Sequence, residues 1–157
     1  MKIRKATKND FKNITRLANK LKVKGDDEGW FLSEALNNMI PVEIKVNSTL
    51  VAVKDNKIVG FLNYFSEEGV IEIAWLGVDP KLHGKGIGKK LVQKIESTAK
   101  KLNVKYIIVD TVPKKQANKP YKKTIEFYER MGFKNYKIEK KAYKNCDKAI
   151  MRKIVLY

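Results

Sequence analysis

Apolar residues recur every three to four positions in four stretches of the chain, as they do along one face of an amphipathic helix. The first stretch follows Thr7, and Asp10 stands three residues later, as in a capping box that begins a helix. The second ends before Pro41, and the fourth begins at Pro120, which suits a first helical turn. The pattern predicts helices over 11–21, 30–40, 87–102 and 120–131.

Segments rich in β-branched and aromatic residues predict seven strands. Two of them flank Asp55 and Asn56, residue types that tolerate positive φ and suit a tight hairpin turn. Stretch 70–78 is apolar on both faces apart from Glu72, which predicts a strand in the middle of the sheet. The expected strands cover 3–6, 49–53, 58–65, 70–78, 106–110, 134–140 and 149–156. This order of elements predicts one α/β domain over 1–157, with a mixed sheet and helices on both faces.

Composition excludes several classes of protein. No apolar run approaches the ~20 residues that a membrane helix needs, and the amino terminus lacks the apolar core of a signal peptide. Cys146 is the only cysteine, so an internal disulfide cannot form, and no ligand cluster surrounds this residue. We therefore expect a cytoplasmic protein that uses no metal and has no membrane partner.

The formal net charge of +17 would ordinarily indicate an anionic partner, with nucleic acid as the first candidate. However, thirty of the 34 basic residues are lysines spread along the whole chain. Proteins that read nucleic acid favour arginine for its planar, bidentate fork. A solvated lysine-rich surface is therefore the preferred interpretation, and nucleic acid or another polyanion remains the alternative.

Segment 78–90 (VDPKLHGKGIGKK) joins the central strand to the long helix, and its glycines lie where that helix begins. Free backbone N–H groups and the positive end of the helix dipole would then point to one place, which suits a phosphate. Glycine permits close approach of the backbone to a pyrophosphate. Two familiar phosphate motifs do not fit, because no Ser or Thr follows Gly-Lys and because 84–88 reads GxGxG, not GxGxxG.

The segment instead resembles the acetyl-CoA loop of the GNAT superfamily of N-acetyltransferases, Gln/Arg-x-x-Gly-x-Gly/Ala after a strand ending in Val-Asp-Pro. His83, Gly86 and Gly88 stand at its three defined positions. A second family signature, an aromatic-Tyr pair ahead of Gly-Phe, is matched by 127–133 (FYERMGF). The resemblance covers essentially the whole chain. It implies the GNAT fold, with a mostly antiparallel central sheet, and acetyl transfer from acetyl-CoA to a primary amine.

The resemblance also implies which residues contact acetyl-CoA. The end of the central strand pairs through its backbone with the pantetheine arm, and the loop binds the pyrophosphate. Two positions depart from the family: His83 replaces Gln or Arg, and Tyr121 replaces an Asn that often contacts CoA, for which Asn118 is the candidate substitute. We interpret His83 as a loop residue and not as a base. The implied residues are Leu76, Gly77, Val78, His83, Gly84, Lys85, Gly86, Ile87, Gly88, Lys89, Asn118 and Tyr121.

Direct attack by a neutral amine needs a base for the acceptor ammonium and an acid for the departing thiolate. Glu72, the only ionisable side chain in the central strand, is the candidate base, and its alternative is a surface carboxylate paired with a lysine. Tyr128 is the candidate acid, and its alternative is a core tyrosine. Asp110, which ends the next strand, is a further candidate for a substrate contact.

Asp26, Asp27 and Glu28 form an acidic cluster between the first two helices, in the region that usually covers the acceptor in the superfamily. This cluster would attract a cationic amine, and its alternative is an ordinary solvated loop. The acceptor, a small molecule or a protein terminus or lysine, stays open, as does the choice between monomer and homodimer. Two other functions remain: a basic nucleic-acid-associated protein with this fold, and a CoA sensor without turnover.

Overall fold

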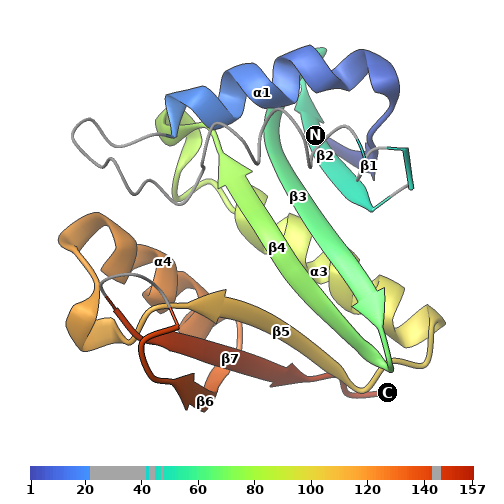
Figure 1. Ribbon diagram of the computed structural model, residues 1–157. Helices are drawn as coiled ribbons and strands as arrows, with labels where there is room; N and C mark the ends of the chain where they lie inside the picture. Colours follow the sequence, from blue (N-terminus) through green and yellow to red (C-terminus); the bar gives the residue numbers. More distant parts are fainter. Residues whose placement is uncertain (22–41, 43–44, 47, 143–145) are drawn as a thin grey trace. The chain divides into compact units, whose positions relative to one another are not determined.

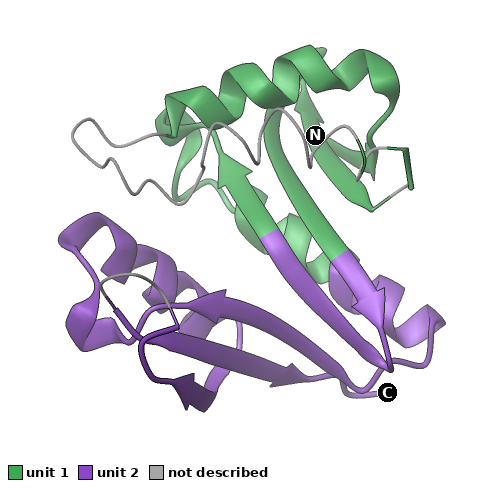
Figure 2. Ribbon diagram, in the orientation of Figure 1, with its two compact units in different colours: residues 1–64, 75–94 green, residues 65–74, 95–157 purple. Residues whose placement is uncertain are grey.

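The computed structural model describes residues 1–21, 42, 45–46, 48–142 and 146–157. The helix expected over 30–40 and the acidic cluster at 26–28 lie outside the described residues. The described chain forms two compact units (Figure 2), residues 1–64 with 75–94 and residues 65–74 with 95–157, here called unit 1 and unit 2.

The helices and strands follow the predicted pattern closely (Figure 1), and their bounds differ from the prediction by at most two residues. The helices are α1 (Phe11–Lys20), α3 (Ile87–Lys101) and α4 (Lys119–Arg130). The strands are β1 (Lys2–Lys5), β2 (Thr49–Lys54), β3 (Lys57–Glu67), β4 (Val70–Val78), β5 (Tyr106–Thr111), β6 (Lys134–Glu139) and β7 (Lys148–Ile154).

The strands form one mixed sheet with the order β1-β2-β3-β4-β5-β7-β6. Strand β4 is the fourth of the seven, so its predicted central position is confirmed. Strands β4 and β5 run parallel, and the pairs β1–β2, β2–β3, β5–β7 and β6–β7 are antiparallel. This mixed α/β architecture confirms the predicted fold class.

Helices cover both faces of the strands in unit 1. Phe61 of β3 belongs to a buried cluster with the apolar side of α1. Its neighbour Gly60 points to the opposite face, since side chains alternate along a strand. A Cβ on Gly60 would lie 3.1 Å from Ile87 and 3.3 Å from Leu91, so α3 packs directly on this glycine. The α1 side of the cluster consists of Ile14, Leu17 and Ala18.

Two hairpin turns use backbone conformations that few side chains adopt. Asp55 and Asn56 have φ of 49° and 59°, which confirms the predicted tight turn between β2 and β3. The turn between β3 and β4 contains Glu68 and Gly69, with φ of 47° and 79°. Because a Cβ on Gly69 would meet nothing within 4 Å, only backbone strain opposes a larger residue there.

The start of α1 is held by a partly buried ion pair in addition to the predicted capping box. The Asp10 carboxylate accepts hydrogen bonds from the Thr7 backbone N–H at 2.7 Å and from the Thr7 hydroxyl at 3.0 Å. The Arg4 guanidinium donates to both carboxylate oxygens, at 2.7 and 2.9 Å. These donors hold the pKa of Asp10 at about 2, below its ordinary value of 3.8.

This lowered pKa predicts how stability depends on pH. The ionised Asp10 contributes fully above about pH 4, and its contribution is lost as the pH falls through the folded-state pKa of about 2. Asp10→Asn should therefore cost about 1–2 kcal/mol at pH 7, and its deficit should shrink toward pH 2. Urea unfolding at a series of pH values measures this. Asp55→Asn, in an exposed turn, is the control, and a deficit independent of pH would contradict the prediction.

Candidate functional site

Side-chain hydrogen bonds hold the loop that connects β4 to α3 in unit 1. The Asp79 carboxylate accepts a hydrogen bond from the Lys81 backbone N–H at 3.1 Å and so caps a short 3₁₀ helix, Pro80–Leu82. The His83 ring nitrogen Nε2 lies 2.9 Å from the Val78 carbonyl oxygen. A carbonyl only accepts, so Nε2 carries the hydrogen in this bond. His83 thus ties the loop to the end of β4, which supports its interpretation as a loop residue.

The three glycines of the loop serve different purposes. Gly84 and Gly86 have φ of 76° and 77°, in the left-handed region where side chains are strained. A Cβ built on either would meet nothing within 4 Å, so the space over both residues is open. Gly88 lies in the first turn of α3 and has no positive φ. Two glycines therefore shape the turn, and the third belongs to the helix.

The first N–H groups of α3 are available to a ligand. The Lys90 N–H donates to the Gly86 carbonyl at 3.1 Å and is the first to close a helical turn. Within the described chain, the N–H groups at positions 86–89 donate to no other residue. Such unpaired donors at a helix start, with the positive end of the dipole, favour an anion. Open space over Gly86 lets a phosphate approach them.

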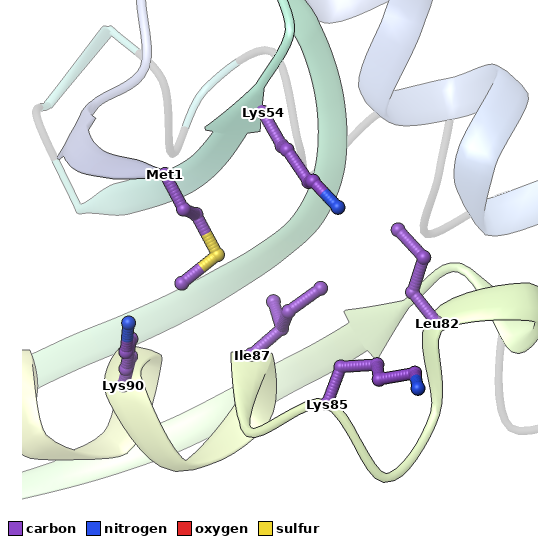
Figure 3. Close-up of a pocket in the computed structure, with 6 residues that line it drawn as sticks. All are labelled: Met1, Lys54, Leu82, Lys85, Ile87 and Lys90. Atoms are coloured by element: carbon purple, nitrogen blue, oxygen red, sulfur yellow. The ribbon is translucent and has the colours of Figure 1, made fainter.

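Three lysines surround a pocket of about 160 Å³ beside this helix start (Figure 3). They come from the end of β2 and from the loop and first turn of α3, and the pocket is lined by Met1, Lys54, Leu82, Lys85, Ile87 and Lys90. Their ammonium groups add to the positive potential of the helix terminus. The charge around this loop therefore also suits an anionic ligand.

The end of β4 leaves its pairing with β5. The register of the two strands runs from Val70 to Ile73 and stops there, although β4 continues to Val78. The backbone of 76–78 is therefore not part of the β5 ladder, as the resemblance implies for a strand that binds pantetheine. Gly77 has a packing role as well, since a Cβ there would lie 2.6 Å from the Phe61 ring. The Phe61 ring thus requires glycine at position 77, and a ligand could contact this residue only through its N–H and carbonyl groups.

In unit 2, the FYERMGF segment forms the carboxyl end of α4. The Phe133 N–H donates to the Tyr128 carbonyl and the Gly132 N–H donates to the Glu129 carbonyl, both at 3.0 Å. With Gly132 at a φ of 89°, this is a Schellman helix ending. The rings of Tyr128 and Phe133 meet edge to face with centroids 5.4 Å apart. The spacing of Tyr128, Gly132 and Phe133 in this signature is therefore the spacing that the helix ending and the ring contact require.

Tyr128 is compatible with both roles considered for it. Its side chain is buried, with 4% of the residue exposed, and burial raises the pKa of the Tyr128 hydroxyl. The hydroxyl therefore stays protonated at neutral pH, as an acid catalyst requires. Among the described residues none accepts or donates a hydrogen bond at this hydroxyl. Its catalytic role stays a prediction.

Glu72 shares its face of the sheet with charged groups on β5 and β7 of unit 2. Burial and the Asp110 carboxylate raise the pKa of Glu72, and the Lys148 ammonium opposes this rise. A carboxyl whose pKa lies above its ordinary value is better suited to accept a proton near neutral pH. The sequence analysis did not single out Lys148, because nothing local distinguishes it from the other lysines.

Asn118 has a structural explanation at the start of α4. The Asn118 side-chain oxygen accepts a hydrogen bond from the Tyr121 backbone N–H at 2.9 Å, and Asn118 is the N-cap of the helix. This bond accounts for Asn at this position without a ligand. Contact of either residue with CoA stays a prediction.

Comparison with known families decides the identity of this fold and loop. The model of the acetyltransferase (GNAT) family matches residues 14–133, a span that contains both the glycine-rich loop and the FYERMGF segment. The protein belongs to the GNAT acetyltransferase family. This GNAT protein is therefore an acyltransferase, as the two motifs predicted.

Solved structures of N-acetyltransferases share the fold of this GNAT protein at low sequence identity. PaiA N-acetyltransferase of Thermoplasma acidophilum, in complex with coenzyme A, has a TM-score of 0.78 at 21% identity, with 98% of each chain covered. An aminoglycoside 6′-N-acetyltransferase complexed with coenzyme A has a TM-score of 0.77 at 18% identity, covering 100% of this chain and 98% of its own.

A third similar structure is the ribosomal-protein-S18-alanine N-acetyltransferase of Escherichia coli. Its TM-score is 0.76 at 15% identity, with 99% of this chain and 94% of the other covered. No curated protein sequence matches the chain significantly. These likenesses confirm the GNAT fold.

Two further features concern only the part of this GNAT protein that the structure describes. No group of three or more His, Cys, Asp or Glu side chains in these residues is arranged to hold a metal ion. No helix among them is long and apolar enough to cross a membrane. The expected cytoplasmic location stays a prediction.

Proposed function

We propose that the protein transfers the acetyl group of acetyl-CoA to a primary amine, by direct attack of the neutral amine. The observation that carries this proposal is the glycine-rich start of α3, where no described residue accepts a hydrogen bond from the N–H groups at 86–89 and the space over Gly86 is open. Acetyl-CoA supplies an activated acetyl thioester with a pyrophosphate as its anchor. The family match supports the same reaction class.

The chain's own groups then divide the binding of acetyl-CoA. The N–H groups at 86–89, with Gly84, Lys85 and the dipole of α3, bind the pyrophosphate. The backbone of 76–78 pairs with the pantetheine amides, because these residues have left the β5 ladder. His83 keeps the loop in register with Val78 through its ring hydrogen bond.

Two side chains move protons in the proposed reaction. The ionised Glu72 carboxylate takes a proton from the acceptor ammonium and leaves a neutral amine with a free lone pair, and Glu72 later returns this proton to water. The Tyr128 hydroxyl gives its proton to the departing CoA sulfur, and the second proton, which the attacking nitrogen loses as the amide forms, returns to Tyr128 through water. No metal ion takes part in this proposal.

The acceptor is a small molecule or a protein terminus or lysine, and the cluster of Asp26, Asp27 and Glu28 attracts it if it carries further positive charge. The whole chain, 1–157, acts as one domain in this proposal. The charge of +17 leaves a second candidate, binding of nucleic acid.

The test is release of CoA in the presence of candidate acceptors. Amines, polyamines and peptides that are acceptors should accelerate release of CoA from acetyl-CoA in a saturable way. The released CoA is measured by chromatography, because a thiol reagent would also react with Cys146. Binding of acetyl-CoA without turnover for any amine would favour a sensor instead. RNA binding with a steep salt dependence, in the absence of acetyl-CoA binding, would favour the polyanion function.

A further inference from the structure

A row of charged side chains crosses four strands of unit 2. In the parallel β4–β5 pair Glu72 stands beside Ile108, so Asp110, two residues later, lies on the same face as Glu72. In the antiparallel β5–β7 pair Asp110 stands beside Ile150, so Lys148 lies on that face too.

The row ends on β6, where Glu139 pairs directly with Lys148. The Lys148 ammonium lies 3.3 Å from the Asp110 carboxylate and 2.8 Å from the Glu139 carboxylate. Its side chain is 22% exposed, and the two carboxylates come from the strands on either side of β7. Lys148 is therefore restrained, unlike a lysine that extends into water.

Two charged groups, one on β5 and one on β7, act on Glu72. Arg152 of β7 stands beside Ile108 and shares this face, but its guanidinium lies over the rings of Tyr106 and Tyr136. Asp110 destabilises the ionised Glu72 by like-charge repulsion, and Lys148 stabilises it by attraction. On the other side of β4, strand β3 contributes only Phe65, Ser66 and Glu67 to this unit, and the one charged residue, Glu67, is exposed at the strand end. The ionisation of Glu72 thus depends on how well Lys148 compensates Asp110.

We propose that Asp110 and Lys148 are positioning residues for Glu72: Lys148, clamped between Asp110 and Glu139, neutralises Asp110 and keeps Glu72 able to ionise and to accept the proton of the acceptor amine. This inference rests on the proposed role of Glu72 as the base. Asp110 tethers the ammonium of Lys148 at the side of Glu72, and Glu139 keeps it from turning into water. The reaction itself passes only through Glu72.

The test compares two substitutions that should act in opposite directions. Lys148→Met should raise the midpoint of Glu72 ionisation by at least about 0.5 pH unit, since it removes the attracting charge and leaves Asp110 uncompensated. Asp110→Asn should lower the midpoint, since it removes the repulsion while Glu139 still holds the Lys148 ammonium. Carbon-13 NMR titration of the Glu72 carboxyl, assigned with Glu72→Gln, measures the midpoint directly, and the acidic limb of kcat/KM against pH should move with it.

Lys137→Met is the matched control, because Lys137 pairs with the same Glu139 at 3.1 Å but is not one of the groups that shift the pKa of Glu72. Lys137→Met should leave the midpoint of Glu72 ionisation unchanged. Lys148→Arg, which keeps the positive charge, should have a midpoint close to that of the wild type. The inference would be overturned if Lys148→Met and Asp110→Asn shifted the midpoint in the same direction, or if neither shifted it. A shifted midpoint in Lys137→Met would also overturn it. Opposite NMR shifts without movement of the kinetic limb would overturn the proposed base instead. If Lys148→Met does not fold, Lys148→Gln provides the same comparison.

Discussion

Tyr128→Phe should lower the single-turnover rate of acetyl transfer at least tenfold. The substitution keeps the ring and removes only the hydroxyl, which we propose protonates the departing CoA sulfur. General acid catalysis typically contributes about 10²- to 10⁴-fold, and a thiolate leaves moderately well unaided, so the lower end is expected. Single-turnover rates are needed because slow product release would mask the effect on kcat.

The structure makes this substitution a clean test. The edge-to-face contact between residues 128 and 133 and the Schellman ending of α4 use only the ring and the backbone, so stability and acetyl-CoA binding should change little. Because burial raises the pKa of Tyr128, the wild-type rate should show no loss of this acid up to about pH 10. Normal single-turnover rates in the variant would mean that water or another residue protonates the sulfur.

Gly86→Val should abolish the stabilisation that acetyl-CoA gives to the protein. A ligand at a hundredfold excess over its Kd stabilises the folded state by about 2.7 kcal/mol. The valine side chain would occupy the open space over Gly86 through which the pyrophosphate reaches the N–H groups of α3. Thermal or urea unfolding with and without acetyl-CoA measures the difference.

Gly69→Val is the matched control for this experiment. Gly69 has a φ of 79°, close to the 77° of Gly86, and a Cβ at either position meets nothing within 4 Å. Both variants should therefore lose about 1–2 kcal/mol from the same backbone strain. Only Gly86→Val should also lose the response to acetyl-CoA, and an intact response in that variant would exclude the pyrophosphate site proposed here.

Much of the fold could be read from the sequence because its signals are local. Helical periodicity, the turn at Asp55 and Asn56, and Pro120 at a helix start each act within a few residues, and the described structure agrees with them. The same is true of the glycine-rich loop, where Gly86 needs a left-handed backbone, and of the FYERMGF helix ending. The two motifs also predicted the GNAT family, and the match to the family model confirms this prediction.

The tertiary structure alone decided which side chains meet across strands. Lys148 follows Asp110 by 38 residues, and their contact depends on the register of β5 with β7, which no local pattern states. The sequence predicted Gly77 as a ligand contact, and only the packing shows that the nearby Phe61 ring leaves no space for a side chain at this position. Strand pairing brings distant residues together through backbone hydrogen bonds that any sequence makes. One lysine among thirty therefore gains its position beside Glu72 only once the sheet has formed.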